Sequence, residues 1–569
     1  MSQLHGRNAA PGVAVGPVFR VVAPEALPVE DLREGPAADE VSRLEDALAR
    51  TVSELNDLAE RVSSEVGPDE AEIFEAHASF ADDPELRANA EDAITQGASA
   101  ERAIIGAFDE FRDLLVVSES EYLSARADDI ADVRDRVVAL LQGVDVGAPV
   151  PVVPSVIVAE TLTPSQTAQI PREMILAIIT ETGSPTSHAA ILARALGVPA
   201  VVAVEGLTAA VARDAVVAVD GSNGDVWVDP DPEQREQLEA RSREAADRRR
   251  LLQDLKDVPG ATADGKHIEL AANIGSTDDL SGAVESGAEG SGLVRTEFLF
   301  IDRQTAPSVE DQVEFYRQVA ASFPGHRVVF RTLDVGADKP LPFIDREPEE
   351  NPALGVRGIR LSLLRDELFR SQLQALLRVA AMDDVGQVAI MFPLVSLPSE
   401  LQRAREIVNE VAEHEGVPLE GIEIGAMVEV PVAALAANRL ARDADFLSVG
   451  TNDLVQYLFA ADRLVGDVTH LTDPCEPEVL RLIGSVVEAG HRQGAWVGVC
   501  GEAASDPAFA MALVGLGVDE LSMTAPAIPE IKDALRRVDA DECREAVDRA
   551  MKADDAAAAR QVLEDAVRT

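Results

Sequence analysis

The part of the chain after residue 260 alternates between short apolar runs and longer amphipathic stretches. Strand-like runs rich in Val, Ile and Leu lie near 268–274, 292–295, 327–333, 388–392, 423–429, 445–449, 496–499 and 520–523, and helical stretches separate most of them. Eight parallel strands that alternate with helices over about 300 residues are typical of a (β/α)₈ barrel. We therefore predict a barrel over residues 261–569.

The earlier part of the chain contains a long run of helical periodicity. Apolar residues recur at helical spacing from Val41 to Val62, and Pro68 ends this first helix. Further helices are predicted near 69–80, 85–96, 100–125 and 128–142. Together these segments predict a small helical bundle over residues 36–143.

Val-rich and Ile-rich runs on both sides of the bundle predict α/β structure. Strands are expected at 12–22, 151–159, 174–180, 215–220 and 225–228. A helix from His188 to Leu196 is closed by Gly197 and then Pro199. Residues 231–257 are densely charged and predict a connector helix about 40 Å long, within a linker that we assign to 231–260.

The charge balance is strongly acidic. Asp plus Glu number 101 and Lys plus Arg number 50, which gives a net charge of −51. Such a surface stays dispersed where salt screens its self-repulsion, so we interpret it as halophilic adaptation to a salt-loaded cytoplasm. It also repels nucleic acid and anionic lipid, so we expect neither as a partner. Without a long apolar run or an apolar signal segment, a cytoplasmic location is expected.

Polar side chains follow the predicted barrel strands at their C-terminal ends, where barrels place their active sites. These residues are Arg295 after the second strand, Arg331 after the third, Glu429 after the fifth, Asn452, Asp453 and Arg463 after the sixth, and Cys500 after the seventh. Arginines bind planar or tetrahedral anions through paired hydrogen bonds. Carboxylates such as Glu429 and Asp453 are ligands that Mg²⁺ prefers. The set predicts a site for a small phosphorylated carboxylic acid.

Each of these residues also has a simpler interpretation. A single arginine or carboxylate at a strand end is usually a surface ion pair or a loop cap, but seven such residues at one barrel mouth are poorly explained in that way. A cysteine in a strand is usually a small buried apolar residue. We keep that interpretation for Cys475 and Cys543, which form no metal-binding spacing with Cys500.

His188 opens the predicted helix that follows Gly183. Thr186 or Ser187 can cap this helix, and its first turn would stabilise a phosphate on the imidazole. The local sequence alone favours the alternative, a packed histidine that shares a helix face with Leu192. His77, in the predicted bundle, is interpreted as facing solvent or a docking partner.

Several motifs resemble one family, in order and spacing and over nearly the whole chain. They are TSHAAILARALGVPA around His188, GLVRTEFLF around Arg295, RTLDVGADKPLP around Arg331, NPALGVRGIR around Arg357, VEVP around Glu429, SVGTNDLVQY around Asp453 and VCGEAASD around Cys500. This set resembles Enzyme I of the phosphotransferase system, a family of enzymes that use phosphoenolpyruvate (PEP).

The resemblance implies a reaction and a role for each residue. His188 would carry the phosphoryl group on Nε2 and pass it to the phosphocarrier protein HPr, and Cys500 would protonate the enolate as pyruvate forms. PEP would be bound by Arg295, Arg331, Asn452, Asp453 and Arg463. Glu429 and Asp453 would hold Mg²⁺.

The resemblance also implies an architecture for this multidomain α/β protein. Residues 1–22 and 146–230 would form a swivelling phosphohistidine α/β domain, and the bundle inserted in it would bind HPr. The barrel would form a homodimer. Two departures from the family pattern are Ser184-Pro185 in place of Gly-Arg before the histidine motif, which removes a basic residue, and Ala337 in place of glycine.

Two other functions use the same residues. The first is that of an enzyme similar to PEP synthase or pyruvate phosphate dikinase, but such enzymes need a large ATP-binding region, and fewer than 190 residues precede His188. The second is that of a regulatory phosphoprotein that senses PEP and signals through the bundle. The complete residue set favours the Enzyme I reaction over the second alternative.

Overall fold

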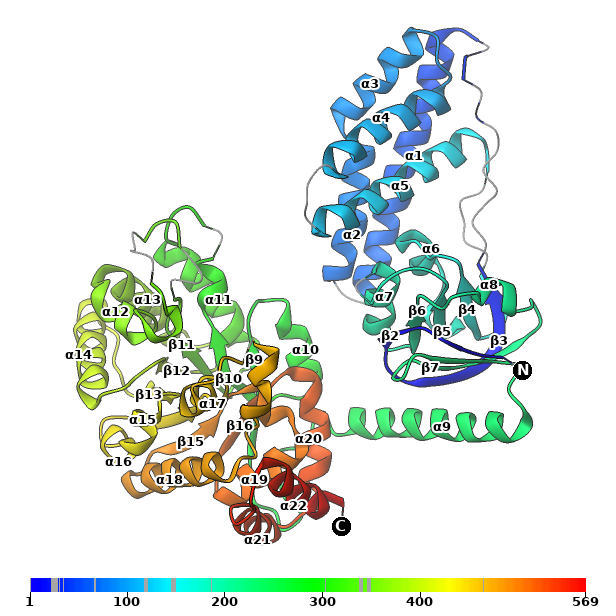
Figure 1. The fold of residues 1–569 in the computed structure, drawn as a ribbon. Coiled ribbons are helices and arrows are strands. Elements are labelled where there is room, and N and C mark those ends of the chain that lie inside the picture. Colours follow the sequence, from blue (N-terminus) through cyan, green and yellow to red (C-terminus); the bar gives the residue numbers. More distant parts are fainter. Residues whose placement is uncertain are drawn as a thin grey trace. The chain divides into compact units, whose positions relative to one another are not determined.

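A computed structural model describes residues 2–21, 29, 31–33, 35–65, 68–116, 121–144, 150–185, 187–301, 303–336, 341–344, 349–463 and 465–568. The chain divides into two units, Met1–Arg248 and Arg249–Thr569, and each is described by itself (Figure 1).

An eight-stranded sheet forms the base of the first unit. Its strands are β1 (Ser2–His5), β2 (Arg7–Ala10), β3 (Val13–Arg20), β4 (Ser155–Ala159), β5 (Ile175–Thr180), β6 (Ala200–Val202), β7 (Val216–Asp220) and β8 (Asp225–Val228). They lie in the order β1-β8-β7-β3-β4-β5-β6-β2, and β3 to β6 run parallel to one another. Strands β1, β2 and β6 were not predicted, because β1 (SQLH) and β2 (RNAA) contain no Val or Ile and β6 has only three residues.

Side chains of the central strands alternate between the two faces of this sheet. Val156 and Val158 belong to one apolar core, whereas Ile157 and Ala159 face the other. The second core also contains buried alanines of helix α7 (His188–Ala195), so α7 packs on that face. The short helices α6 (Pro164–Gln169), η1 (Arg172–Met174) and α8 (Leu207–Ala210) complete the α/β part.

A helical bundle is inserted between β3 and β4, which are neighbours in the sheet (Figure 1). Its helices are α1 (Ala37–Glu65), α2 (Pro68–Ala81), α3 (Pro84–Thr95), α4 (Ala100–Val116) and α5 (Glu121–Leu141). The helices predicted over 100–125 and 128–142 correspond to α4 and α5, and residues 117–120 between these two helices lie outside the described residues.

The interpretation of His77 as a residue that faces solvent or a partner was wrong. The side chain is 1% exposed and lies on α2 between two phenylalanines. Its ring centroid is 6.0 Å from that of Phe74 and 6.4 Å from that of Phe80. His77 is therefore a core residue of the bundle.

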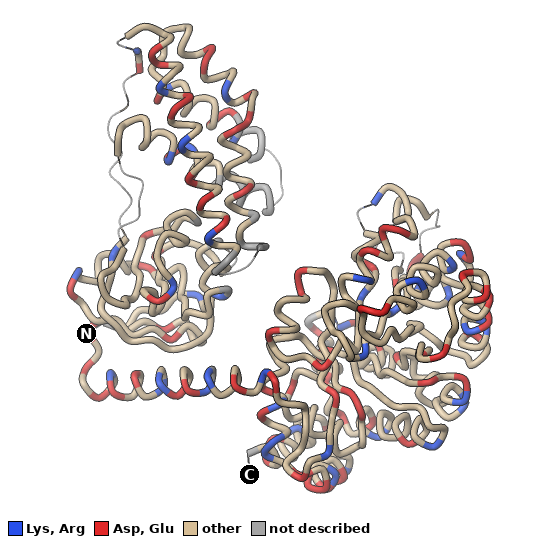
Figure 2. The backbone as a smooth tube through the Cα atoms, turned by 180° about the vertical axis from the view of Figure 1, so that it is seen from behind, with Lys and Arg blue, Asp and Glu red and all other residues tan. Residues whose placement is uncertain are grey.

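Helix α9 (Pro232–Asp254) follows the sheet and has closely spaced charges of both signs along its length (Figure 2). Its first half is attached to the sheet. Leu238 packs against Val13 and Ala218, and Arg241 forms a 2.7 Å ion pair with the buried carboxylate of Asp220.

The second unit is a closed barrel of eight parallel strands (Figure 1). The strands are β9 (Glu269–Ile274), β10 (Gly290–Arg295), β11 (Arg327–Arg331), β12 (Gln387–Phe392), β13 (Glu423–Val428), β14 (Phe446–Val449), β15 (Trp496–Val499) and β16 (Glu520–Met523). All eight predicted strands are present. The predicted fold class, a multidomain α/β protein with an inserted bundle and a (β/α)₈ barrel, is confirmed.

Helices surround the barrel and also extend it at the C-terminus. They are α10 (Asp279–Glu285), α11 (Val309–Ala321), α12 (Ile359–Leu364), α13 (Asp366–Ala380), α14 (Pro398–Glu415), α15 (Pro431–Leu435), α16 (Ala437–Leu440), α17 (Thr451–Phe459), α18 (Pro477–Gln493), α19 (Pro507–Leu516), α20 (Ile528–Leu535), α21 (Ala540–Ala550) and α22 (Ala556–Arg568). Short 3₁₀ helices are η2 (Glu297–Leu299), η3 (Pro352–Leu354), η4 (Gly466–Leu471), η5 (Glu502–Ser505) and η6 (Ala525–Ala527).

The barrel interior is filled by apolar side chains. Leu293, Val329, Met427 and Phe446 form one buried cluster there, and Cys500 belongs to it. Among the described helices of the whole chain, none is both long and apolar enough to cross a lipid bilayer.

Candidate active site

A cavity of about 150 Å³ lies at the C-terminal ends of the barrel strands. It is lined by Leu293, Arg295, Glu297, Phe298, Ile301, Arg331, Asp334, Arg357, Met427, Glu429, Gly450, Asn452, Asp453, Arg463, Cys500 and Gly501. All seven residues that the sequence analysis placed at the barrel mouth are in this set. The structure brings them together, and their individual roles stay predictions.

Arg331, at the end of β11, is held between two carboxylates. Its guanidinium lies 2.8 Å from Glu297 and 3.2 Å from Asp334. Burial by itself lowers the pKa of this guanidinium, but the neighbouring charges of Glu297 and Asp334 raise it overall. Arg331 is therefore a permanent and largely buried cation in the wall of the cavity.

Arg357 was quoted in a motif but not predicted as a site residue. It precedes α12 and forms two hydrogen bonds with Asp334, at 3.0 and 2.7 Å, and one with Asp453 at 3.1 Å. Burial opposes the charge of Arg357, but the hydrogen bonds and charge of Asp334 raise its pKa. Its segment follows no predicted strand, so the strand-end rule could not find it.

Asp334 and Glu297 were also missed as site residues. Both lie within three residues of a predicted arginine, so the sequence held a signal for them. An acidic residue just beyond a strand end, next to an anion-binding arginine, is a natural partner for that arginine.

Glu429 follows β13 and is almost fully buried. One of its oxygens accepts a 2.6 Å hydrogen bond from the backbone N–H of Leu394. Burial, together with the charges of Asp453 and Asp334, raises the pKa of Glu429 to about 8. A Cβ at Gly450 would lie 3.1 Å from this carboxylate, so glycine leaves room for it.

The carboxylates of Asp334, Glu429 and Asp453 each place one oxygen within 4.8 Å of the others. Three carboxylates at such distances repel one another unless a proton or a cation lies between them. Hard oxygen ligands in this number suit Mg²⁺, which keeps some of its positions for substrate oxygens and water. The donor set therefore fits a divalent cation, with Arg357 at one edge of the cluster.

Asn452 and Arg295 are linked through the segment that follows β15. The Asn452 amide donates to the Glu502 carboxylate at 3.2 Å, and the Glu502 N–H donates back to Asn452 at 3.2 Å. Arg295 lies 3.9 Å from the same carboxylate. The three residues belong to different barrel segments, and Glu502 holds them at one side of the cavity.

Cys500 lies in the wall of the cavity, at the end of β15. Its backbone N–H donates to the carbonyl of Val449 at 3.1 Å, which fixes the residue against β14. Burial raises the pKa of the Cys500 thiol to about 11, so the thiol keeps its proton at neutral pH. Cys475 and Cys543 are buried free thiols outside this cavity, as predicted.

His188 lies in the other unit, at the first position of α7. Ser187 occupies the N-cap but makes no capping bond with its side chain, and Thr186 lies outside the described residues. Arg194 connects the loop before the helix to strand β2, because its guanidinium donates to the carbonyls of Pro185 and Ala9 at 2.8 Å each. Arg194 thus supplies a cation near this loop, although the Ser184-Pro185 departure removes one. The His188 side chain itself lies outside the described set.

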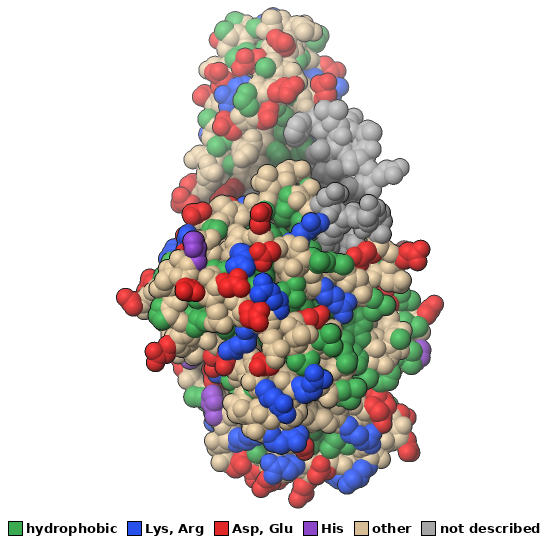
Figure 3. Space-filling model, turned by 90° about the vertical axis from the view of Figure 1, so that its left-hand side faces the viewer, with side chains coloured by type: hydrophobic (Ala, Val, Ile, Leu, Met, Phe, Trp, Pro, Cys, Tyr) green, Lys and Arg blue, Asp and Glu red, His purple; other side chains and the backbone are tan. Residues whose placement is uncertain are grey.

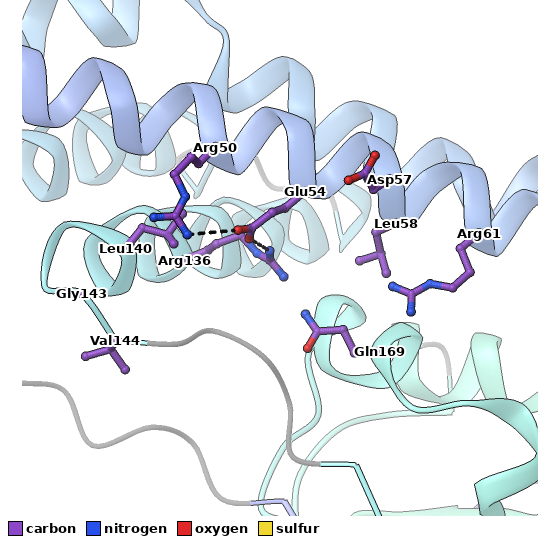
Figure 4. A pocket seen from close by; sticks show the side chains of 10 residues that line it. All are labelled: Arg50, Glu54, Asp57, Leu58, Arg61, Arg136, Leu140, Gly143, Val144 and Gln169. Atoms are coloured by element: carbon purple, nitrogen blue, oxygen red, sulfur yellow. Dashed lines mark hydrogen bonds and ion pairs between the residues drawn. The ribbon is translucent and has the colours of Figure 1, made fainter.

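A second cavity, of about 590 Å³, lies between α1, α5 and α6 in the first unit (Figure 4). The guanidiniums of Arg50 and Arg136 are both directed at Glu54, at 3.7 and 2.7 Å. This side of the cavity therefore carries two guanidiniums for one carboxylate. Cys500, the candidate proton donor, is not among the described residues that line it.

Comparison with known proteins identifies the class that this fold and site define. Residues 249–540 match the PEP-binding domain of PEP-utilising enzymes, 152–224 match the mobile domain of these enzymes, and 5–126 match their N-terminal domain. The chain is thus built throughout from the parts of a PEP-utilising enzyme.

Full-length relatives define the family more closely. A phosphoenolpyruvate-protein phosphotransferase of Haloferax volcanii is 45% identical over 531 residues, which cover 92% of each chain. One from Listeria innocua is 40% identical over 546 residues, which cover 95% of each chain. The chain belongs to the phosphoenolpyruvate-protein phosphotransferase (Enzyme I) family. The predicted family and enzyme class are confirmed, which favours them over a dikinase or a non-catalytic regulator.

Proposed function

We propose that this chain moves the phosphoryl group of PEP to His188 and then to the phosphocarrier protein HPr, as the first step of a sugar phosphotransferase system. The observation that carries this proposal is the barrel cavity. Arg295, Arg331 and Arg463 line it together with an acidic cluster and a protonated thiol. A cavity with these groups suits a ligand that has both a phosphate and a carboxylate.

The arginines bind and orient PEP. Arginines form paired hydrogen bonds with tetrahedral and planar anions, so several of them fix a phosphate and a carboxylate at once. Arg331, held by its two carboxylate neighbours, loses little freedom when PEP binds. Asn452 and Asp453 complete the substrate contacts.

Mg²⁺ would be held by Glu429 and Asp453, next to Asp334. The ion would supply positive charge that offsets the phosphate and the developing enolate. Glu429 supports this role because it is buried beside two other carboxylates, an arrangement that a cation stabilises. Binding of the ion should keep Glu429 ionised.

The chemical step exchanges one bond to phosphorus for another. The bond between phosphorus and the enol oxygen of PEP breaks, and a bond from phosphorus to Nε2 of His188 forms. The enolate then takes a proton at C3 from the thiol of Cys500, which gives pyruvate. Solvent restores the proton on Cys500.

His188 and the cavity lie on separate units, so the reaction needs a hinge motion that brings the histidine to PEP and then to HPr. The helical bundle would bind HPr, since it forms a separate surface on the unit that carries His188. A cytoplasmic location agrees with the three free thiols.

The barrel would form the homodimer. Figure 3 shows one face of the molecule, on which hydrophobic side chains are exposed among charged ones. Large exposed apolar residues of the barrel unit include Leu364, Leu397 and Leu435. Light scattering in molar KCl should give the mass of a dimer, and a monomer at micromolar concentration would contradict this part of the proposal.

Pyruvate release from PEP with Mg²⁺, measured with and without HPr, tests the function. We expect sustained turnover with HPr and a single turnover per His188 without it. Sustained turnover without a carrier protein, or dependence on ATP, would point to a different enzyme.

A further inference from the structure

A buried amide connects the ends of β10 and β11 behind the cavity. Gln372 lies on α13 and is 1% exposed. Its Nε2 donates to the hydroxyl of Thr296 at 3.1 Å and to that of Tyr316 at 3.0 Å, and its Oε1 accepts from the N–H of Leu333 at 2.9 Å. Thr296 directly follows β10, and Leu333 lies two residues beyond β11. One side chain therefore holds both strand ends.

Thr296 completes the connection. Its hydroxyl donates to the carbonyl of Arg331 at 2.9 Å while it accepts from Gln372. Thr296 and Tyr316 are both 0% exposed. Without water to replace a missing partner, each of these groups depends on the others.

The backbone alone pairs these strands irregularly. Arg295 and Arg331 are directly opposed in the ladder, but the register shifts between Ser291 and Val294, and the pairing ends at the two arginines. The bonds of Gln372 and Thr296 begin where the ladder stops. They are therefore placed to set the separation of the two arginines.

We propose that Gln372 is a positioning residue for phosphoryl transfer from PEP. Through Thr296 and Leu333 it fixes the spacing of Arg295 and Arg331, although it does not line the cavity itself. This inference rests on the proposed function, in which both arginines bind PEP. A small error in such spacing lowers the rate strongly, because the reacting groups must be aligned.

Gln312 offers a matched control in the same buried network. It lies on α11, is 0% exposed and accepts a 3.3 Å hydrogen bond from Tyr316. Its amide donates to the carbonyl of Pro307 and the hydroxyl of Ser371, so it contacts neither strand end. Loss of Gln312 should cost packing and hydrogen bonds without changing the spacing of the arginines.

The test compares Gln372→Leu with Gln312→Leu in the full-length protein. The kcat and KM for PEP are measured by pyruvate release, and phosphate exchange between His188 and HPr is measured separately. We expect Gln372→Leu to lower kcat/KM for PEP by about 10- to 100-fold. The KM for HPr and the exchange rate should not change, because that half-reaction does not use the barrel. Gln312→Leu should change kcat/KM for PEP far less at a similar melting temperature.

A second pair of variants keeps the proposal testable if Gln372→Leu does not fold. Thr296→Val removes the linking hydroxyl with little change in volume and should also lower kcat/KM for PEP, whereas Thr296→Ser should restore most of it. Equal losses in Gln372→Leu and Gln312→Leu, or wild-type kinetics in Thr296→Val, would overturn the positioning role. A wild-type protein that releases no pyruvate from PEP would instead overturn the proposed function.

Discussion

Both carboxylate oxygens of Asp334 accept hydrogen bonds from the guanidinium of Arg357, at 3.0 and 2.7 Å. The same carboxylate lies 3.2 Å from Arg331, and its side chain is 1% exposed. One buried acid thus fixes the distance between two guanidiniums in the wall of the cavity. It also belongs to the acidic cluster with Glu429 and Asp453, so it links the arginines to the expected metal site.

Asp334→Ala should therefore damage both binding and stability. Removal of one partner from a buried ion pair costs about 3–5 kcal/mol, so we expect a lower melting temperature. Arg331 would keep Glu297 and Arg357 would keep Asp453, but the distance between the two guanidiniums would no longer be fixed, so kcat/KM for PEP should fall by about 100-fold. Asp541→Ala is the control, since its ion pair with Arg544 is exposed. Similar effects of the two substitutions would argue against a special role for Asp334.

Glu429→Gln should abolish autophosphorylation by PEP. The variant keeps the size of the side chain but loses the charge that Mg²⁺ needs. Phosphate exchange between His188 and HPr should continue, and this exchange serves as the internal control for folding. EDTA should reproduce the effect reversibly in the wild-type protein. Full PEP-dependent activity in Glu429→Gln would remove Glu429 from the metal site.

Cys500→Ala should bind PEP but release pyruvate slowly, because the enolate loses its proton donor. Cys475→Ala and Cys543→Ala should behave as the wild type does. Burial raises the pKa of Cys500 to about 11, so the thiol remains protonated below that value. The rate of pyruvate formation should therefore show no loss from thiol ionisation between pH 7 and 9. Wild-type turnover in Cys500→Ala would make Cys500 a core residue only.

The net charge of −51 predicts that stability rises with salt. Salt at about 1 M shortens the screening length to about 3 Å, which weakens repulsion between the acidic side chains. Melting temperature measured against KCl concentration should increase up to the molar range. A melting temperature that is equally high in dilute buffer would contradict halophilic adaptation.

Cutting the chain should separate the two half-reactions. Residues 1–248 should exchange phosphate with phosphorylated HPr yet remain inert to PEP, and 249–569 should bind PEP without passing phosphate to HPr. Radiolabelled phosphate on a gel would show this. If PEP alone labels the fragment of residues 1–248, the PEP site lies on that fragment and not on the barrel.

The position of the cut matters for the barrel fragment. The buried ammonium of Lys532 donates to the carbonyls of Lys256 and Gly287, at 2.8 and 2.6 Å. A fragment that starts at residue 260 loses the first of these acceptors. It should therefore melt at a lower temperature than 249–569, and equal melting temperatures would show that this contact contributes little.

Much of this architecture could be predicted because its signals are local. Each barrel strand is a short apolar run, and the parallel strands of a barrel all end at the same mouth. Arg295, Glu429 and Cys500 could therefore be assigned to one site from the sequence alone. The burial of His77 could not be predicted in this way. It depends on how the helices of the bundle pack together, and the sequence around His77 is compatible with either face.

The sequence by itself determined the barrel, the inserted bundle, the family and the residues at the strand ends. Hydrophobic periodicity and the order of motifs are properties of the linear chain, so they can be recognised before any tertiary contact is known. The tertiary structure alone decided which side chains hold these residues in place. Arg357 reaches Asp334 and Asp453, and Gln372 reaches Thr296 and Leu333, across separations of 23 to 96 residues. Such pairings depend on distances that only the closed barrel creates.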